Sequence, residues 1–414
     1  MRILFFSTAF PQPYEPSRNP DNLERCVALA QHHAVHVVSP YTWLRLWSRA
    51  DTRESYLRGL PVSRPGFFYP PGVLRGTHAW WMWQGIRRAA SRTLAAFRPD
   101  AVLSYWTYPD TAVAARLATL ADVPCVAIVG GSDVLSIDPA APGAAGRRVR
   151  RTLQSVDGIA AVSDSIRDHI STLGIPRGKI AVLPAAVDHE IFFPTSRQDA
   201  RRRLSMPVDA QILVWIGRMV AVKALDVLID AIGQLAPGEP RLRLYLVGDG
   251  PLRRALESRV ARHGLGLQVH FRGRVAHRDL PDYYRAADVT LLPSEWEGMP
   301  NTLIESHACG TPFVASAVGA IPQLANRGVD ELVAPGDRRQ LAAAIARSLR
   351  RRGEHGGVAT CSAGGWDGMA ERLVEMLAAA RGRRSVSVAA AVRSAPRPLR
   401  TPLHRNRHRS WRES

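Results

Sequence analysis

Along the first 190 residues, short apolar runs alternate with longer segments in which apolar positions recur every three or four residues. The short runs predict buried strands and the longer segments predict amphipathic helices, because these are the hydrophobic periods of the two structures. The predicted strands are residues 2–7, 35–39, 101–105, 124–129, 158–162 and 179–183. The predicted helices are residues 22–32, 79–97, 111–121, 144–156 and 165–173.

The same alternation of strands and helices starts again in the second half of the chain. Its predicted strands are residues 212–216, 243–247, 269–272, 289–292 and 312–315. Its predicted helices are residues 223–235, 252–263, 280–287, 302–309 and 339–350. Strands that alternate with helices form parallel sheets covered on both faces. The fold class is therefore α/β, with two doubly wound Rossmann-like domains.

The length of 414 residues also favours two domains. We expect an N-terminal domain at 1–190, a polar, basic linker at 191–208 and a C-terminal domain at 209–362. A last amphipathic helix at 366–380 precedes a tail at 381–414. Two such domains facing each other across a cleft bring the C-terminal ends of both sheets to one site, where sheets of this kind bind ligands.

The net charge of +19 is concentrated at the C-terminus. Residues 381–414 contain ten arginines and one acid, Glu413, among Ser, Pro and Ala, which is typical of a disordered basic tail. Such a tail is suited to an anionic membrane surface, and drift of composition in an arginine-rich proteome is the other explanation. We expect no specific nucleic-acid partner.

The cysteines and the N-terminus indicate the compartment. The four cysteines, Cys26, Cys125, Cys309 and Cys361, stand singly, which predicts reduced thiols and no structural zinc. The first ten residues are interpreted as a strand that runs into Pro11 rather than as a signal sequence. No apolar run is long enough to cross a bilayer. We expect a cytoplasmic protein, peripheral at the inner face of the membrane through its tail.

Two glutamates, Glu297 and Glu305, lie eight positions apart where a predicted strand gives way to a predicted helix. The turn between them carries Gly298 and Pro300, and unpaired N–H groups at the start of the helix favour an anion there. Carboxylates accept charge-assisted hydrogen bonds from neighbouring hydroxyls. Glu305 is therefore a candidate for binding a ribose, and Glu297 for facing a sugar.

The whole string EGMPNTLIE, followed by SHACGTP, resembles the E-x7-E signature of the family-4 retaining glycosyltransferases. The resemblance implies the GT-B fold, with the last helix crossing back onto the first domain and Trp366 as its anchor. It also implies a nucleotide diphosphate sugar as donor. Its donor-binding residues here would be Glu305 and the turn of Gly298, Met299, Pro300, Asn301 and Thr302.

Three further strings in the second half match the same family. IGRMVAVK places Arg218 and Lys223 at a strand end, where two cations would neutralise a diphosphate. VGDGP carries Gly248 and Gly250, which permit close backbone approach to a ligand. FRGRV resembles the family's F-x-G segment, in which the backbone around Arg274 and Val275 would meet the base.

In the first half, YPD at 108–110 and GGSD at 130–133 resemble the family's Y-P-D and H-G-S-D elements. Gly131 would let the backbone reach the donor phosphate, and Asp133 would act from across the cleft. The chain departs from the family pattern at Gly130, where His is usual, and at Ala186, where Gly is usual. The loop at 11–20 lacks the usual pair of glycines. These departures favour a branch that builds surface polysaccharides or exopolysaccharides.

No metal site is expected, because the chain has no Asp-x-Asp pair. Core or surface roles are predicted for the histidines His32, His33, His307, His404 and His408. Transfer without a metal or other cofactor is the prediction. The cluster Trp80-Trp81-Met82-Trp83, near Arg87 and Arg88, has two interpretations. It either faces a lipid-linked acceptor at a membrane interface or packs inside the first domain.

The predicted function is transfer of a sugar from a nucleotide diphosphate sugar to an acceptor hydroxyl, with retention, on a growing polysaccharide or lipid-linked saccharide. The resemblance implies that the departing phosphate oxygen takes the acceptor's proton. Arg218 and Lys223 would then stabilise the charge on the diphosphate, Glu297 would position the sugar, and Asp133 would act from across the cleft. Two alternatives stay open. One is a nucleotide-sugar epimerase, which needs histidines facing the cleft, and none is predicted there. The other is a catalytically silent sugar- or nucleic-acid-binding protein.

Overall fold

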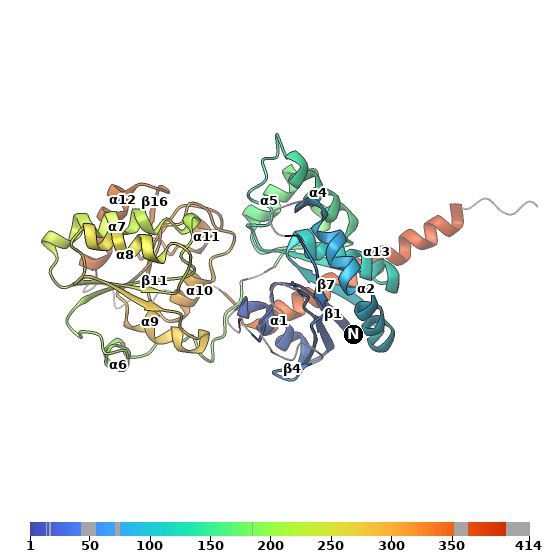
Figure 1. Ribbon diagram of the computed structural model, residues 1–414, viewed down its shortest axis with the longest axis horizontal. Helices are drawn as coiled ribbons and strands as arrows, with labels where there is room; N and C mark the ends of the chain where they lie inside the picture. Colours follow the sequence, from blue (N-terminus) through green and yellow to red (C-terminus); the bar gives the residue numbers. More distant parts are fainter. Residues whose placement is uncertain are drawn as a thin grey trace, which may run out of the picture.

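The computed structural model describes residues 1–13, 15, 18–42, 55–70, 75–183, 185–351 and 363–394. Within these residues the chain forms two α/β lobes, each built on its own mainly parallel sheet (Figure 1). The predicted α/β fold class with two domains is confirmed. Cys361, Pro184, His404 and His408 lie outside the described residues.

The first sheet has eight strands in the order β10-β9-β8-β7-β1-β2-β5-β4. All neighbours are parallel except the antiparallel pair β4 and β5. The strands are β1 Arg2–Phe6, β2 Ala34–Val38, β4 Ser55–Leu57, β5 Leu60–Ser63, β7 Ala101–Tyr105, β8 Cys125–Val129, β9 Gly158–Ala161 and β10 Ile180–Val182. A separate parallel pair joins β3 Tyr41–Thr42 and β6 Gly66–Phe67.

Helices cover both faces of this sheet, as the alternating side chains of β1 demonstrate. Leu4 and Phe6 pack into one core with helices on one side, whereas Ile3 and Phe5 pack into a second core on the other side. The helices of the first core are α2 His78–Phe97, α3 Ala112–Ala121, α4 Gly143–Ser155 and α5 Asp164–Thr172. Those of the second core are α1 Pro20–Ala30 and α13 Trp366–Ser394.

The second sheet is fully parallel, in the order β13-β12-β11-β14-β15-β16. Its strands are β11 Gln211–Ile216, β12 Leu242–Val247, β13 Val269–Gly273, β14 Val289–Leu292, β15 Phe313–Ser316 and β16 Glu331–Val333. Its helices are α6 Arg197–Arg203, α7 Leu225–Leu235, α8 Arg253–Arg262, α9 Leu280–Ala286, α10 Asn301–Ala308, α11 Ile321–Leu324 and α12 Arg338–Arg350. β11 again sends Leu213 and Trp215 to one core and Ile212 and Val214 to the other.

The last helix, α13, packs against α1, β8 and β9 of the first lobe through Leu373 and Leu377 (Figure 1). It continues to Ser394, beyond the end that the sequence predicts at residue 380. The run VSVAAAV within this stretch lacks Gly and Pro, and its alanines favour continuation of the helix. In the described part of the chain, no helix is long and apolar enough to cross a membrane.

The segment predicted as a linker contains a helix, α6, that packs against α9 in the second lobe. Arg201 of α6 is buried and donates to Asp288 at the start of β14 at 2.8 Å. It also donates to the carbonyl oxygens of Val208, Ala210 and Ala286. These bonds fix α6 to the second sheet.

Candidate active site

The C-terminal strand ends of the two sheets face a cleft of about 660 Å³ between the lobes. This volume falls within the range of small-molecule sites. Four residues singled out from the sequence line its second-lobe wall: Arg218, Gly248, Arg274 and Val275. The first-lobe wall includes Thr8, Arg18, Asn19 and Trp106. The cleft is thus built from both domains, as two facing doubly wound domains should build it.

The turns after β11 and β12 pack backbone against backbone. A Cβ on Gly248, whose φ is 129°, would overlap the carbonyl oxygen of Gly217, and one on Gly250 would overlap that of Met219. Gly248 lines the cleft, whereas Gly250 serves this packing and does not line it. Arg218 is exposed and, within the described residues, forms no ion pair. It therefore presents a free cation to the cleft.

Lys223 and Glu297, which the sequence analysis assigned to different parts of the donor, pair with each other. Lys223 Nζ lies 2.6 Å from Glu297 Oε1, and Ser294 Oγ donates to the same oxygen at 2.7 Å. Lys223 ends a short helical turn, Ala221–Lys223, which precedes α7. The predicted helix start at residue 223 is therefore two residues early. The pair ties this turn to the loop before α10.

Glu305 is buried in α10 and accepts two hydrogen bonds. Tyr284 donates its hydroxyl to Oε2, and His277 donates Nε2–H to Oε1, both at 2.7 Å. Burial alone would lower the pKa of His277, but its hydrogen bond to Glu305 and the charges of Glu305, Asp21 and Glu24 hold that pKa above its ordinary value. His277 thus favours the charged form beside Glu305.

His277 itself lines the cleft, which corrects the expectation that no histidine would face it. Sequence reasoning missed this residue because it belongs to none of the matched strings. It reaches Glu305 only through folding of the turn before α9 (His277–Asp279) against α10. The one available signal was the position of His277 shortly after the predicted strand at 269–272, whose end faces the site.

The two lobes touch through glycine backbones. A Cβ on Gly131, whose φ is 126°, would lie 2.7 Å from Gly298 Cα, and a Cβ on Gly298 would overlap the carbonyl oxygen of Gly130. A Cβ on Gly319 would overlap the carbonyl oxygen of Glu297 on the other side of the same turn. The turn after Glu297 is therefore enclosed by glycines, and its contact with the first lobe requires that residues 131 and 298 lack side chains.

Gly130, the departure from the family pattern, is explained by Tyr105. A Cβ at position 130 would lie 2.5 Å from the Tyr105 hydroxyl oxygen. Tyr105 thus occupies the space into which a larger residue at 130 would have to fit. The first-lobe wall of this chain is consequently built differently from the pattern H-G-S-D.

Asp133 does not extend across the cleft but is bound within its own lobe. Its Oδ2 accepts from the Thr107 amide at 3.0 Å and hydroxyl at 2.7 Å, and its Oδ1 accepts from the Gly131 amide at 2.8 Å. Burial raises the pKa of Asp133, and these hydrogen bonds counteract that rise. The geometry indicates that Asp133 positions the Gly130–Gly131 turn.

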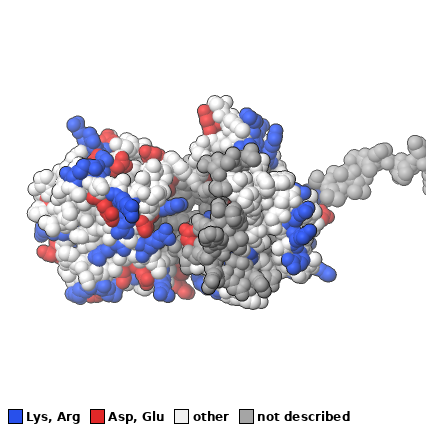
Figure 2. Space-filling model, viewed as in Figure 1, with Lys and Arg blue, Asp and Glu red and all other residues white. Residues whose placement is uncertain are grey.

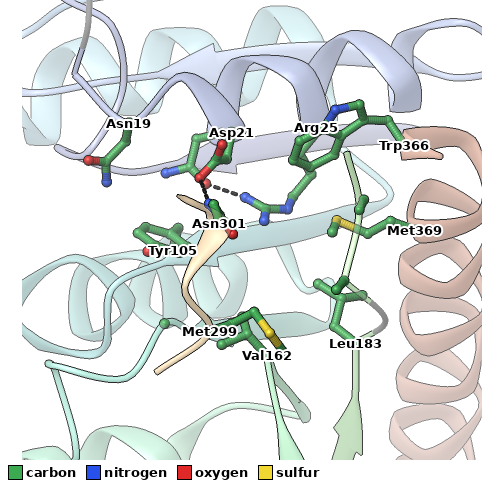
Figure 3. A pocket seen from close by; sticks show the side chains of 14 residues that line it. Asn19, Asp21, Arg25, Tyr105, Val162, Leu183, Met299, Asn301, Trp366 and Met369 are labelled. Atoms are coloured by element: carbon green, nitrogen blue, oxygen red, sulfur yellow. Dashed lines mark hydrogen bonds between the residues drawn. The ribbon is translucent and has the colours of Figure 1, made fainter. Parts of the chain in front are cut away.

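The rest of the turn around α10 divides between two environments. Met299 and Asn301 line a second, smaller cavity between the lobes, and the Asn301 amide donates to Asp21 of α1 (Figure 3). Pro300 is buried as the residue before α10, and Thr302 is half-buried and lines neither cavity. The described residues contain no cluster of three or more His, Cys, Asp or Glu that could hold a metal.

Two family models match this chain. Residues 21–191 match the model described as glycosyltransferase family 4, and residues 210–351 match the model of glycosyl transferases group 1. The chain belongs to the family-4 glycosyltransferases. The two matches fall on the two lobes that enclose the cleft.

Two relatives show which glycosyltransferases this chain is similar to. A protein of Bacillus subtilis named as teichuronic acid biosynthesis glycosyltransferase TuaC is 27% identical over 365 residues, which are 84% of this chain and 89% of that protein. A D-inositol 3-phosphate glycosyltransferase of Streptosporangium roseum is 32% identical over 237 residues. This second match spans 54% of each chain, so it relates about half of the two proteins.

Solved structures agree with this glycosyltransferase in fold. Sucrose-phosphate synthase of Thermosynechococcus elongatus superposes with a TM-score of 0.71 at 21% identity, covering 95% of this chain and 98% of the other. HepE of Anabaena in complex with UDP superposes with a TM-score of 0.67 at 18% identity, covering 94% and 100%. At these identities the likeness shows the GT-B architecture.

Proposed function

We propose that the protein is a retaining glycosyltransferase that moves a sugar from a nucleotide diphosphate sugar to an acceptor hydroxyl. The observation that carries the proposal is the 660 Å³ cleft between the lobes, into which the second lobe presents Arg218, Gly248, Arg274 and Val275. The likeness to HepE, whose structure contains UDP, supports a nucleotide diphosphate donor. The likeness to TuaC supports an acceptor from surface-polysaccharide synthesis.

In this proposal, Arg218 and Lys223 bind the diphosphate and Glu305 binds the ribose. Lys223 lies beside the turn of Glu297, to which it donates a hydrogen bond. His277 and Tyr284 orient the Glu305 carboxylate through its two oxygens. The remaining lone pairs of that carboxylate would accept the ribose hydroxyls with charge-assisted strength. The backbone around Arg274 and Val275 would meet the base.

The transfer step proceeds on one face of the sugar. The bond from the anomeric carbon to the diphosphate oxygen breaks, the bond to the acceptor oxygen forms, and the acceptor proton moves to the departing phosphate oxygen. Arg218 and Lys223 stabilise the negative charge that grows on the diphosphate. Glu297 and the backbone of the turn from Gly298 to Asn301 hold the sugar in place. Because two cations neutralise the leaving group, the proposal includes no metal.

The acceptor side of the proposal involves a membrane. A basic aromatic surface on the first lobe, composed of Phe68, Trp80, Arg87, Arg88 and Arg92, lies on and beside α2. Trp80 is 52% exposed and Phe68 45%, whereas Met82 and Trp83 are buried. Basic side chains gather along the outer edge of the first lobe, whereas on the second they are interspersed with acids (Figure 2). Exposed aromatics beside arginines suit an anionic interface.

Sedimentation with vesicles tests this membrane contact. The protein should co-sediment with vesicles that contain anionic lipid and should not co-sediment with vesicles of zwitterionic lipid. The triple variant Trp80→Ala, Arg87→Gln, Arg88→Gln should co-sediment less. Equal binding of the variant and the parent protein would count against this surface. The basic tail, which lies outside the described residues from 395 on, is compared by truncation after Ser394.

A second candidate, a nucleotide-sugar epimerase, is favoured by one observation. His277 and Glu305 form a hydrogen-bonded acid and base pair at the cleft, which such a reaction requires. Incubation of a donor sugar with the protein and no acceptor separates the two. A new epimer in the proton spectrum would favour the epimerase, and an unchanged donor sugar would favour the transferase.

The donor is tested by thermal stabilisation with UDP-, GDP- and ADP-sugars, with and without EDTA, in the parent protein and in Glu305→Ala. The expected result is a higher melting temperature with one nucleotide, lost in Glu305→Ala and unchanged by EDTA. Stabilisation that depends on a divalent cation would exclude metal-free transfer. No stabilisation by any nucleotide would favour a silent binding protein.

A further inference from the structure

A second cavity, of about 70 Å³, lies between α1, α13 and the turn before α10 (Figure 3). Five polar side chains line it: Asn19, Asp21, Asn22, Arg25 and Asn301. Tyr105, Met299 and Trp366 form part of the rest of the wall. The cavity is too small for a sugar ring, but it is large enough for one substituent of a few atoms.

Arg25 is the unusual member of this wall. It is 5% exposed, and its described hydrogen bond runs from Nη1 to Asn22 Oδ1. Its Nε has no partner, and in the described residues the guanidinium forms no ion pair within 4 Å. Its Cζ lies 5.8 Å from the ring centres of both Tyr105 and Trp366. Since Arg keeps its charge in proteins, this cation is buried with most of its donors unused.

Arg201 provides a comparison, because it is a buried arginine with a purely structural role. It is 1% exposed, and its Nε, Nη1 and Nη2 donate to three carbonyl oxygens and to Asp288. A buried charge normally has such partners because an unpaired one is costly. The contrast indicates that the described residues of the chain do not supply a partner of this kind to Arg25.

The acid nearest to Arg25 does not supply that partner. Asp21 lines the same cavity, but its Oδ2 is engaged by the amide of Asn301 from the other lobe, as Figure 3 shows. The remaining polar side-chain groups of the wall are the Tyr105 hydroxyl and the amides of Asn19 and Asn22, and the amide of Asn22 donates to the Ala9 carbonyl oxygen at 2.6 Å. Within the part of the chain that the structure describes, Arg25 and Asn19 thus face the cavity with unused donors.

We propose that Arg25 binds an anionic group, a carboxylate or a phosphate, that a saccharide substrate inserts into this cavity. The planar guanidinium can donate two parallel hydrogen bonds to the two oxygens of a carboxylate or phosphate. The inference rests on the proposed function, because Met299 and Asn301 of the cavity wall belong to the turn assigned to the transferred sugar. The anionic group is carried by the donor sugar or by the acceptor, and the arms of the experiment separate these sources.

Titration calorimetry with matched pairs of ligands tests the proposal. The donor pair is UDP-glucuronate against UDP-glucose, and the acceptor pairs are glucuronate and glucose 6-phosphate against glucose. In the parent protein, one charged member should bind at least tenfold more tightly than its neutral partner. In Arg25→Gln this ratio should fall to about one, and in Arg262→Gln, a control on exposed α8, it should stay unchanged.

A parent protein without preference for any charged ligand, or a preference that persists in Arg25→Gln, overturns the proposal. If Arg25→Gln does not fold, Arg25→Lys replaces it, because lysine keeps the charge and loses the planar pair of donors. The ratio should then fall at least threefold, and an unchanged ratio overturns the proposal. UDP alone, titrated in parallel, reports on the proposed function: binding of UDP without discrimination refutes only the role of Arg25.

Discussion

Lys223 and Glu297 form an ion pair of 2.6 Å at the mouth of the turn that leads into α10. Each side chain is partly buried, and Ser294 shares the same carboxylate oxygen. The pair joins the two strings that most resemble the glycosyltransferase family, GRMVAVK and EGMPNTLIE. A diphosphate that binds Lys223 therefore acts directly on the residue proposed to hold the sugar.

Lys223→Met should lower kcat/KM for the donor by about 10²-fold, because it removes one fixed charge that stabilises the leaving group. The same substitution in a Glu297→Gln background should cost less stability than in the parent protein, with a coupling of about 1 kcal/mol in a double-mutant cycle. Donor kinetics and urea unfolding of the four proteins measure both quantities. Arg262→Met on α8 is the matched control, and full activity of Lys223→Met would contradict the assignment.

Gly298→Ala should prevent the two lobes from meeting as they do here, because the added Cβ overlaps the Gly130 carbonyl oxygen. Gly131→Ala adds a strained positive φ to a similar clash. We expect at least a tenfold loss of transfer, a larger radius of gyration in solution scattering, and little change in nucleotide affinity, since the proposed nucleotide contacts lie on the second lobe.

Gly143→Ala provides the control for the glycine variants. Gly143 also has a positive φ, of 56°, but a Cβ there meets nothing within 4 Å. It therefore adds a strained positive φ of its own without a contact between the lobes. Equal losses in Gly131→Ala and Gly143→Ala would show that strain, rather than the meeting of the lobes, accounts for the effect.

The regular elements of the fold could be predicted from the sequence because both sheets are buried on two faces. Runs such as Ile212–Ile216 are then continuously apolar and bounded by turns, which is a strong local signal. The short edge strands β4 and β16 were missed, because three residues carry too little pattern. Helix α6 was placed in a linker because its mainly basic sequence includes only two buried residues, Ala200 and Arg201.

The site could be predicted only where its residues are neighbours in the chain. Arg218, Gly248 and Arg274 follow strands and were found from their strings. Asp21 and Asn301 lie 280 positions apart, and their contact depends on how the two lobes meet. No local pattern encodes that arrangement, so the small cavity around Arg25 became visible only in three dimensions.

His277→Gln should destabilise the protein most at low pH. The pKa of His277 is raised in the folded state, so its stabilising pair with Glu305 is fully present below the unfolded pKa of about 6.5 and is lost as the pH rises through the folded pKa. The difference in unfolding free energy between the parent protein and His277→Gln should be largest near pH 6 and shrink toward pH 9. A difference independent of pH would mean that His277 acts by packing alone.

Asp21→Asn should raise the free energy of unfolding above pH 7, although the loss of an interior carboxylate usually lowers it. Burial, together with the charge of Glu305, raises the pKa of Asp21 to about 6, so the folded protein holds this proton more tightly than the unfolded chain does. Stability should therefore fall by about 3 kcal/mol in total as the pH rises from below 4 to above 6. Asn keeps an acceptor for Asn301 and carries no charge.

The Asp21→Asn variant should consequently match the parent protein near pH 4 and exceed it above pH 7, in urea unfolding followed by circular dichroism. Asp110, whose pKa burial raises to about 7, adds a slope of the same sign in both proteins. The difference between the two curves isolates Asp21 from that background. A variant that is less stable than the parent protein at pH 8 would show that the Asp21 carboxylate contributes more through Arg25 and Asn301 than its burial costs.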